Sequence, residues 1–425
     1  MACLRARVGC LLVLLLTSGQ AWADGLVRDG IGPISTGRGG TNLGFSDNGA
    51  VIYDNPAGMV NVSGNGLLEA AADTVITDLH FTNASNDVLG RTKPFPLPEL
   101  SAIRKFDDGD LAIGIGVFAP AGLSARYDMQ NPVTGPAPYQ SFGALAKILP
   151  GVSYRITDRL SLGGTLGVGI SIINFEGPYY VQTGLLAGAP TLIDFHSAGA
   201  APTGSVGLQY LLSDDATLGF NWISASSFNL SGTASASVFG LGPLPVGSNF
   251  TSTGHITWPQ SFAWGFKHSL TPRHRVSADL YWYNWSSAFN HFDFTLSNAS
   301  NPLVPALAGP TIHDSLALNW QNTCSLRLGY EFLQDSRNIW RCGGVYHSSP
   351  SPSSTLNPYT DGVLEYAVSC GYSHRFQRAS FNLAYQYSWG HTRHVQTSSL
   401  LGGDFNNSSM NAQAHWLSAG FTVPF

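Results

Sequence analysis

One segment in the last third of the chain alternates apolar and polar residues for longer than a soluble fold requires. Between Ser315 and Phe332, apolar residues fall on one face of an extended strand and polar residues such as Arg327 fall on the other. The alternation is interrupted only at Asn322 and predicts one strand of about eighteen residues, whereas five or six are typical. A transmembrane β-barrel accounts for this length, because its strands present apolar residues to lipid and polar residues to the lumen.

The chain combines few charged residues with the absence of a long apolar segment after its N-terminus. Charged residues make up 11% of the sequence, against roughly 25% in a soluble globular domain. Alternating strands hide apolar residues without a long apolar run, and a closed sheet pairs every backbone group. The 10 Trp, 16 Tyr and 23 Phe residues suit interfacial girdles, and the 48 glycines suit turns and a crowded lumen. The net charge of −5 offers no polybasic surface, so we expect no nucleic-acid partner.

Both ends of the chain predict a protein of the outer membrane of a Gram-negative bacterium. Arg5 and Arg7 precede a short apolar run, and Ala21-Trp22-Ala23 forms a small-x-small cleavage site. Residues 1–23 are therefore predicted to be a signal peptide. The last strand alternates and ends on Phe425, which resembles the signal that the barrel-assembly machinery reads. We expect that machinery and outer-membrane lipid as partners.

Alternation along residues 65–425 predicts fourteen barrel strands. Their connections are alternately short and long, and the short ones are rich in Asp, Gly, Pro and Ser, which are turn residues. Short periplasmic turns and longer outer loops are the topology of a transmembrane barrel, and an even count returns the last strand to the periplasm. The predicted strands are 65–83, 96–106, 110–119, 140–156, 160–176, 203–212, 217–233, 249–270, 275–297, 315–333, 338–348, 363–376, 380–397 and 411–425.

The segment before the first strand has a different composition. Residues 24–64 are rich in Gly, Asn, Ser and Asp and show no sustained period of two. This segment is predicted either to fold into the lumen as a hatch (plug) or to remain a disordered periplasmic tail. The predicted fold is thus all-β, a 14-stranded antiparallel outer-membrane barrel over residues 65–425, with an N-terminal hatch over residues 24–64.

Several short motifs, in their order along the mature chain, resemble the FadL family of outer-membrane transporters for long-chain fatty acids and other hydrophobic compounds. No single motif is specific, but their succession is. The resemblance implies a monomeric, passive, ligand-gated channel without a cofactor, and a fourteen-stranded barrel with a hatch, in agreement with the strand count. The motifs are Gly37-Arg38-Gly39-Gly40-Thr41, Asp54-Asn55-Pro56-Ala57-Gly58-Met59, Phe118-Ala119-Pro120-Ala121-Gly122-Leu123, Trp258-Pro259-Gln260-Ser261 with Asn284-Trp285-Ser286, and Leu326-Arg327-Leu328-Gly329-Tyr330-Glu331.

The resemblance also implies where the channel moves. In the family a hydrophobic ligand passes from the outer loops to a lumen site, the hatch shifts, and a kink in the third strand opens the wall sideways. By this resemblance Asn55, Pro56 and Ala57 belong to the moving hatch, and the run Ala119, Pro120, Ala121 and Gly122 marks the kink. Proline donates no ladder hydrogen bond and glycine packs little, so this run is expected to disturb strand pairing. The alternative is that Pro120 only ends the third strand.

The outer loops favour an apolar ligand. Residues 234–250 carry no charge and include Phe239, Leu241 and Leu244, and residues 297–312 carry none and include Leu303 and Leu307. The loop near 178–200 is similarly apolar and has Asp194 as its only formal charge. Contiguous exposed apolar patches mark binding sites, so these loops are candidate ligand-capture loops. The alternative is that the loops pack only on one another.

The predicted lumen offers little to a carboxylate. A fatty acid needs a basic residue for its head group, yet the strand from Leu160 to Phe175 is uncharged. Ile172-Ile173-Asn174 occupies the region where the family carries basic residues linked to fatty-acid binding. This departure speaks against a carboxylate ligand and leaves room for neutral or aromatic hydrocarbons. Charged residues near the periplasmic end are predicted to hold the hatch, because a buried charge needs a partner; these are Arg327, Glu331 and Arg341.

Other functions find less support. There is no G-x-S-x-G or H-E-x-x-H motif, and His391 and His394 have no metal-binding context, so neither an enzyme nor a metal site is expected. The main alternative is a structural or adhesive outer-membrane barrel without transport. Cys324, Cys342 and Cys370 remain in the mature chain and are predicted to face outward. Cys342 and Cys370 are interpreted either as a disulfide across neighbouring strands or as small lipid-facing residues.

Overall fold

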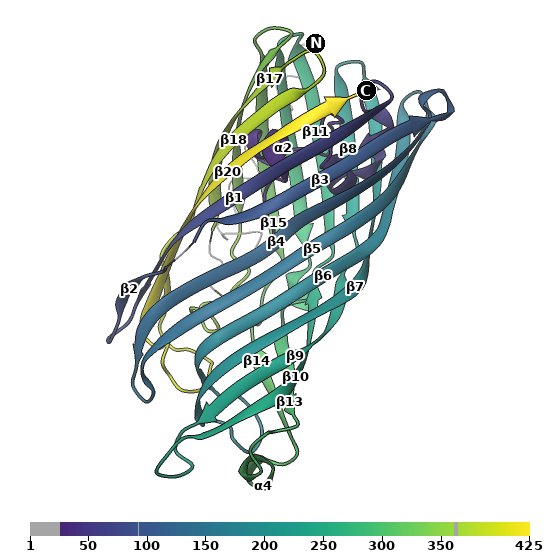
Figure 1. The fold of residues 1–425 in the computed structure, drawn as a ribbon. Coiled ribbons are helices and arrows are strands. Elements are labelled where there is room, and N and C mark those ends of the chain that lie inside the picture. The colour runs from purple at the N-terminus through teal and green to yellow at the C-terminus, as the bar shows by residue number, and fades with distance from the viewer. Residues whose placement is uncertain (1–25, 92, 361–363) are drawn as a thin grey trace.

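A closed antiparallel β-barrel forms the wall of the protein. The computed structural model describes residues 26–91, 93–360 and 364–425, so the predicted signal peptide lies outside the described residues. The wall closes where β1 (Gly66–Thr82) pairs with β20 (Ser408–Pro424) along sixteen consecutive residue pairs. Figure 1 shows the strands tilted around the barrel, with the C-terminus at the end that carries the short turns. The barrel has fourteen strands, as the alternation predicted.

Several barrel strands are interrupted, so the fourteen strands comprise twenty ladder segments. Each interrupted strand is given as two segments. In chain order the strands are β1, β2 with β3 (Asp87–Leu89 and Phe95–Phe106), β4 (Leu111–Asn131), β5 (Gly135–Thr157), β6 (Leu160–Tyr180), β7 (Pro190–Ser213), β8 with β9 (Ala216–Ile223 and Ser226–Val238), β10 with β11 (Val246–Trp258 and Ser261–Thr271), β12 with β13 (His274–Tyr283 and His291–Ser297), β14 with β15 (Thr311–Ala317 and Thr323–Leu333), β16 (Asn338–His347), β17 (Tyr366–Arg375), β18 with β19 (Ser380–Trp389 and Arg393–Val395) and β20.

The helices that the structure describes are all short. They are α2 (Gly32–Gly37), α3 (Val51–Asp54), η2 (Pro56–Asn61), η3 (Asp107–Gly109), η4 (Trp285–Ser287) and α4 (Leu303–Ala308). None of them has the length and apolar character that a membrane-crossing helix needs.

The prediction of one uninterrupted strand between Ser315 and Phe332 is wrong. The strand breaks between β14 and β15, and the side chains change face across the break. Leu318 is buried inside the barrel, whereas Leu326 and Leu328 are exposed on the outside. Because side chains alternate with a period of two, an irregular connection between two segments can exchange the inward and outward faces while the apolar alternation continues. The interruption at Asn322 marks the break in the sequence, but the alternation that continues beyond it concealed the change of face.

The outer connections are shorter than predicted because several strands extend beyond the predicted ends. The region 178–200, predicted as a loop, is largely strand, because β6 continues to Tyr180 and β7 begins at Pro190. Residues 234–250 likewise contribute to β9 and β10, and residues 297–312 include α4. The antiparallel β6–β7 ladder reaches Tyr180↔Pro190, so this hairpin is built of paired strands almost to its tip.

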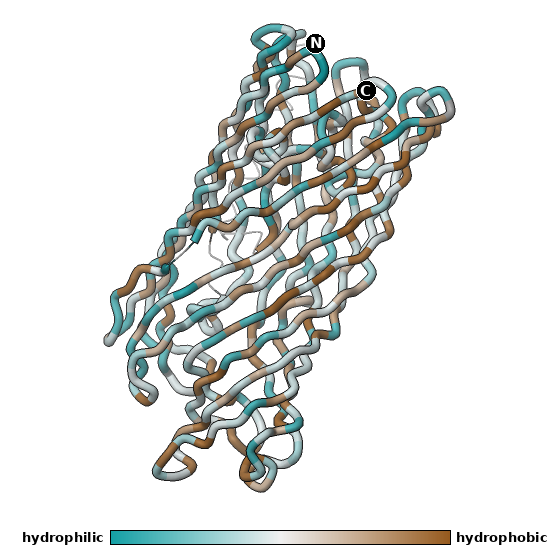
Figure 2. Tube along the Cα trace, in the orientation of Figure 1, coloured by the Kyte–Doolittle hydropathy of each residue, from teal (hydrophilic) through white to brown (hydrophobic). Residues whose placement is uncertain are grey.

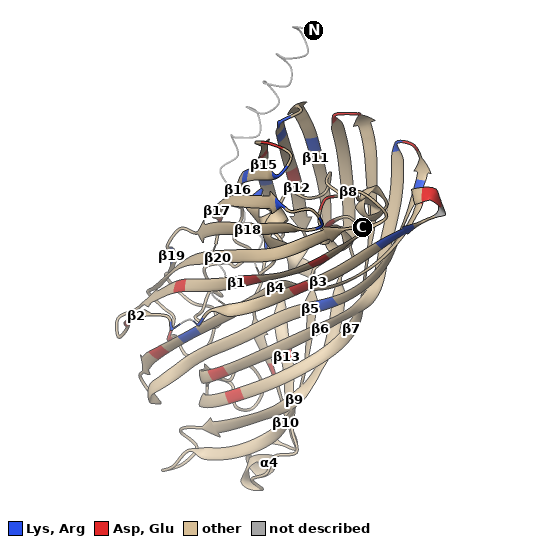
Figure 3. Ribbon diagram, turned by 45° about the horizontal axis from the view of Figure 1, so that its top comes forward, with Lys and Arg blue, Asp and Glu red and all other residues tan. Residues whose placement is uncertain are grey.

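The outer surface is apolar and the interior is polar at the short-turn end. Exposed leucines such as Leu166 and Leu328 lie on the outer face, while Asp279 and Glu331 are buried on the inner face. Figure 2 shows hydrophobic residues distributed over the whole wall, and Figure 3 shows that charged residues are sparse along the strands. This is the pattern that lipid outside and a polar lumen inside impose on alternating strands.

The N-terminal segment lies inside the barrel. Figure 1 shows α2 enclosed by the strands, and the residues of α2 and most of η2 are buried. Glycines allow this segment to touch the wall: Gly37 meets Gly371 of β17, and Gly39 lies against Gly343 of β16. A Cβ atom added at Gly343 would overlap the backbone of Arg38 and Gly39. Backbone-to-backbone contact of this kind requires glycine on the strand side.

The contact at Gly343 predicts how the segment responds to a single methyl group. Gly343→Ala should displace residues 37–40 and expose the N-terminal segment to protease, because Gly39 occupies the space of the new Cβ. Gly344→Ala is a matched control on the same strand, since the nearest heavy atom to its added Cβ is 3.9 Å away. Limited proteolysis of the two folded variants in detergent measures the effect. Equal protection in both would show that residues 37–40 do not press on β16.

Candidate functional site

An apolar cavity lies inside the barrel toward the end with the long loops, and the space between its lining residues, open solvent included, is about 870 Å³. Its lining is rich in aromatic rings. The lining residues come from the strands of the barrel wall and from loops near Tyr359 and Phe405. A concave site lined by apolar and aromatic side chains with few polar groups is typical of small-molecule sites. The aromatic lining residues are Phe142, Phe175, Tyr179, Tyr180, Phe289, Phe292, Tyr359 and Phe405.

The strand breaks build one side of this cavity. β10 ends at Trp258 and β11 begins at Ser261, and a wider break separates β12 from β13. On the loop side of the breaks the inward face is taken by residues such as Ile256, Phe292 and Leu316, which line the cavity. On the other side of the breaks the inward positions carry residues such as Asp279. On the loop side of the breaks, apolar residues therefore point inward and surround the cavity. On the short-turn side of the breaks, polar residues point inward.

A second apolar cavity lies among the outer hairpins and α4, and the space between its lining residues, open solvent included, is about 580 Å³. Of the five predicted ligand-capture residues, Leu241 and Leu307 line it. Leu244 and Leu303 are exposed, and Phe239 is half-buried outside the lining. Val246 and Phe250 lie within residues 234–250, which were predicted as a ligand-capture loop, and they line the same cavity from β10.

Tyr179 separates the two cavities and lines both of them. Its Oη donates a hydrogen bond of 2.8 Å to Asp314 Oδ2, and its ring lies 6.1 Å from that of Phe294. Asp314 also accepts hydrogen bonds from the backbone amides of Gln182 and Thr183. Asp314 is therefore a buried acceptor whose partners hold the β6 end and its loop against β14.

Neither cavity carries a cation among its described lining residues. Asp404 contributes the one formal charge in the lining of the inner cavity, and Asp314 contributes that of the outer cavity. Asp404 accepts a 2.6 Å hydrogen bond from Asn131, and burial raises the pKa of its carboxyl group above the ordinary value. A carboxylate ligand would meet negative charge here, whereas an uncharged ligand would not.

The predicted kink region interrupts the pairing of β4. Phe118 pairs with Lys147 and Ala121 with Leu145, so β4 contains one residue more than β5 over this stretch. Such an extra residue is a β-bulge, and it exchanges the faces of β4 on its two sides. The β3–β4 ladder ends at Leu100↔Val117, and no described ladder joins residues 95–99 to β4. The expectation that Pro120 merely ends the third strand is wrong, because β4 continues to Asn131.

The N-terminal segment takes the hydrogen bonds that β4 loses at this seam. Val27 forms a bridge with Ala121, the Arg28 amide donates to Pro120 O at 3.0 Å, and the Gly122 amide donates to Leu26 O at 3.1 Å. The Arg28 side chain also bonds Ala119 O and forms a buried ion pair with Asp73 of β1. Residues 26–28 therefore act as a short inner strand that covers the seam between β3 and β4.

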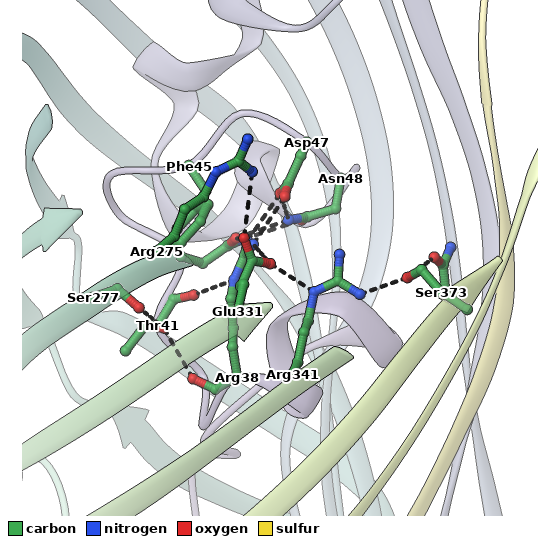
Figure 4. A network of polar contacts seen from close by, with 12 residues as sticks. Arg38, Thr41, Phe45, Asp47, Asn48, Arg275, Ser277, Glu331, Arg341 and Ser373 are labelled. Carbon is green, nitrogen blue, oxygen red and sulfur yellow. Dashed lines mark hydrogen bonds and ion pairs between the residues drawn. The ribbon is translucent and has the colours of Figure 1, made fainter. Parts of the chain in front are cut away.

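A charged network holds the N-terminal segment to the short-turn end of the wall (Figure 4). Arg38 binds Asp47 at 2.9 Å and Glu331 at 3.1 Å, and Arg341 binds Glu331 at 2.7 Å.

The Phe45 ring lies near two cations, 3.4 Å from the Arg38 guanidinium and 5.5 Å from the Lys267 ammonium. Burial by itself raises the pKa of Asp47, but Arg38 together with Arg341 and Asn48 outweighs it, so that the pKa is lowered. The predicted contribution of Glu331 and Arg341 to holding this segment is consistent with these contacts; Arg38 and Asp47 were not identified from the sequence as their partners.

The predicted hatch residues are buried against the wall. Asn55 donates from Nδ2 to Leu43 O at 2.8 Å and to Leu208 O of β7 at 3.0 Å. Its Oδ1 accepts from the Ala57 amide at 3.2 Å, and Pro56 begins η2. The side chain of Asn55 thus caps η2 and ties it to β7.

Asp54, immediately before this cap, is a buried acid with a raised pKa. Burial, opposed by a 2.6 Å hydrogen bond from Asn42, raises the pKa of Asp54 to about 7. Among the described residues no group of three or more His, Cys, Asp or Glu is arranged to hold a metal ion.

Comparison with known proteins identifies the family. Residues 14–425 match the model of the family described as outer membrane protein transport protein (OMPP1/FadL/TodX). The solved Pseudomonas putida toluene transporter TodX has a TM-score of 0.77 at 19% identity, over 93% of this chain and 99% of that one. A Pseudomonas aeruginosa FadL homologue has a TM-score of 0.75 at 16% identity, over 94% and 100%. The Ralstonia pickettii toluene transporter TbuX has a TM-score of 0.73 at 18% identity, over 93% and 99%. No curated protein sequence matches the chain.

Asp54 should make attachment of the N-terminal segment depend on pH. Its folded pKa of about 7 lies above the ordinary value of 3.8, so the attached segment binds a proton more tightly than the released one. Its contribution to attachment is complete below pH 3.8 and is lost as the pH rises to about 7. Hydrogen-exchange protection of residues 42–58, corrected for intrinsic rates, should fall across this window. Asp54→Asn, which keeps the uncharged shape, should make the fall in protection less steep; an unchanged slope in this variant would assign the dependence to another group.

Proposed function

This chain belongs to the OMPP1/FadL/TodX family of outer-membrane transport proteins, and we propose that it is a passive channel for the uptake of neutral, preferably aromatic, hydrocarbons. The observation that carries this proposal is the aromatic inner cavity, whose described lining includes an acid and no cation. Aromatic rings favour aromatic ligands through stacked and edge-to-face contacts, and they require no charge on the ligand. Two solved relatives are described as toluene transporters, which supports the same class of ligand.

The two cavities define a route. A ligand would leave the outer membrane surface for the outer cavity near Leu241 and Leu307, and Tyr179 would swing aside to admit it to the inner cavity. Leu123 of β4 and Gly143 of β5 line the inner cavity. They are paired with each other beside the bulge of β4, where the ligand would leave through the wall. The apolar lining offers a continuous low-energy environment over the first two steps of this route.

Lateral exit at the β3–β4 seam is the proposed last step. In the closed state residues 26–28 occupy the seam, and the ion pair of Arg28 with Asp73 fixes them there. Rearrangement of the hatch around Asn55, Pro56 and Ala57 would withdraw this inner strand and open the seam to lipid. A hydrophobic ligand then enters the bilayer directly and avoids the aqueous periplasm. The protein acts as a monomer in this scheme, with outer-membrane lipid as the acceptor.

Lys147 favours a second candidate ligand, a fatty acid. Its side chain points inward and is buried, and its ammonium lies 5.7 Å from the centre of the Tyr53 ring, a cation–π contact. Lys147 forms no ion pair among the described residues and lies opposite Phe118 at the bulge. A carboxylate that passed the inner cavity would find its counter-charge there. Lys147 lines neither cavity, so we rank the neutral ligand first.

Uptake by cells lacking their own transporters, expressing this chain, tests the function. We expect accumulation of labelled toluene and little accumulation of a labelled long-chain fatty acid. Phe292→Asp should reduce toluene uptake by about tenfold or more, because it places a charge in the cavity. The neighbouring outward residue provides the control Asp293→Asn, which should leave uptake unchanged.

Other results would change the assignment. Uptake of the acid alone, lost in Lys147→Met, would replace the neutral ligand with a fatty acid. Uptake of neither compound by a correctly folded barrel would favour the structural or adhesive alternative.

Deletion of Pro120 tests lateral exit. Removing one residue eliminates the bulge between Phe118 and Ala121, so β4 should pair continuously with β5 and the seam should close. We expect toluene uptake to fall to the background level while the heat stability of the barrel is maintained. Pro150→Ala is the control, because Pro150 is an exposed proline on β5 outside the bulge. Full uptake by the deletion variant would instead indicate exit past the hatch into the periplasm.

A further inference from the structure

Two cysteines face each other across neighbouring strands on the outer surface. Cys342 of β16 and Cys370 of β17 are direct partners in the antiparallel ladder, and both side chains are exposed outward as thiols. Side chains of directly opposed residues lie on the same face of the sheet, with Cβ atoms about 4.5–5.5 Å apart. The two sulfur atoms therefore share one face and one level of the wall.

The hydrogen bonds at both ends of this ladder show which kind of pair the cysteines form. His347 N donates to Glu365 O at 2.9 Å, and Arg375 N donates to Arg337 O at 2.8 Å. Both bonds join residues that oppose each other in the same register as Cys342 and Cys370. His347 and Arg337 each lie five residues from Cys342 along the chain. Hydrogen-bonded and non-hydrogen-bonded pairs alternate, so an odd separation places the cysteines at a non-hydrogen-bonded pair.

That position suits a disulfide. Opposed Cα atoms in non-hydrogen-bonded pairs are about 4.5 Å apart, with their side chains closer than in the other kind of pair. Disulfides span Cα distances of about 4.4–6.8 Å. Cys324 is excluded as an alternative partner, because it lies six residues from Tyr330, the β15 residue opposite Cys342. Six strand residues correspond to about 20 Å.

The inner face of the same strand pair explains what a covalent link would stabilise. Gly343 and Gly371, each next to one of the cysteines, are the residues against which Gly39 and Gly37 of the N-terminal segment lie. Gly343 and Gly344 are consecutive, so β16 lacks side chains on both faces there. Glycine within a strand weakens it, because it forms no cross-strand side-chain contact. The β16–β17 pair thus has little cross-strand side-chain support where residues 37–39 lie against it.

We propose that Cys342 and Cys370 form a disulfide that links β16 to β17 on the outer face of the wall, opposite the place where residues 37–39 contact the inner face. The inference is independent of the transported ligand. The cell envelope outside the cytoplasm is an oxidising compartment, in which disulfides form and persist. One thiolate attacks the disulfide of a periplasmic dithiol–disulfide oxidant to form a mixed disulfide, and the second thiolate attacks the cysteine sulfur of that mixed disulfide and releases the thiolate of the oxidant. Two thiols lose two protons and two electrons, and the oxidant is reduced to its dithiol. This exchange precedes insertion of the strands into lipid, while both thiols are in water.

A single tryptic peptide reports the link. Residues 342–375 contain no Lys or Arg before Arg375 and follow Arg341, so trypsin releases both cysteines in one peptide. The full-length protein is extracted from outer membranes without reductant and alkylated under denaturing conditions. We expect this peptide to be unalkylated and two hydrogen masses lighter than its reduced form. Cleavage after Glu365 should yield two fragments that separate only after reduction. Alkylation of both cysteines without reductant would overturn the proposal.

A stability measurement tests the proposed effect of the disulfide. Reductant should shift the heat-unfolding midpoint of the wild-type barrel downward by several degrees and make residues 37–40 more accessible to protease. Cys342→Ser with Cys370→Ser should show the lower midpoint with and without reductant. Cys324→Ser is the matched control and should retain the reductant-sensitive shift. A wild-type midpoint that does not respond to reduction would refute the stabilising role, even if the linked peptide is found.

Discussion

Backbone groups that face lipid need hydrogen-bond partners within the protein, and the architecture of this chain depends on that requirement. The β1–β20 ladder closes the sheet, so the barrel has no free edge at its ends. The wall departs from full pairing where β4 bulges and β3 no longer reaches it. Residues 26–28 supply the missing partners from inside. A segment that has no membrane-facing surface thus completes the hydrogen bonding of the membrane wall.

The position of the N-terminal segment follows from two kinds of contact with different tolerance for movement. Contacts through Gly37 and Gly39 require close backbone approach and are lost with small displacements. The ion pairs of Arg38 with Asp47 and Glu331 are longer-ranged; Arg38 and Glu331 are shielded from water by burial, whereas the Asp47 side chain is 34% exposed. Buried charges need their partners, so this network favours one attached position. These contacts hold the segment at α2 and Arg38. Residues 26–28, which precede α2, cover the seam between β3 and β4.

Alternation and turn residues were sufficient to predict the number of strands and the short connections, because lipid imposes the same period on every strand. They were insufficient for the cavity. Leu316 and Leu326 have equivalent places in the alternation, yet one faces inward and the other outward. The interruption of the pattern at Asn322 marks the break that separates them, but it does not show that the faces exchange, which tertiary packing decides. Likewise, Glu331 is recognisable as a buried acid, but its partner Arg38 is 293 residues away in the sequence.

The breaks that separate β8 from β9, β10 from β11, β12 from β13 and β14 from β15 change the inward and outward phase of four neighbouring strands within one continuous sheet. In these strands the part nearer the short turns sets which residues meet lipid and the N-terminal segment, and the part nearer the loops sets which residues surround the cavity. A shift of a break by one residue along the chain would exchange the cavity lining locally and leave the other part in register. Ligand preference in such a barrel can therefore diverge through small insertions and deletions, without cost to membrane insertion.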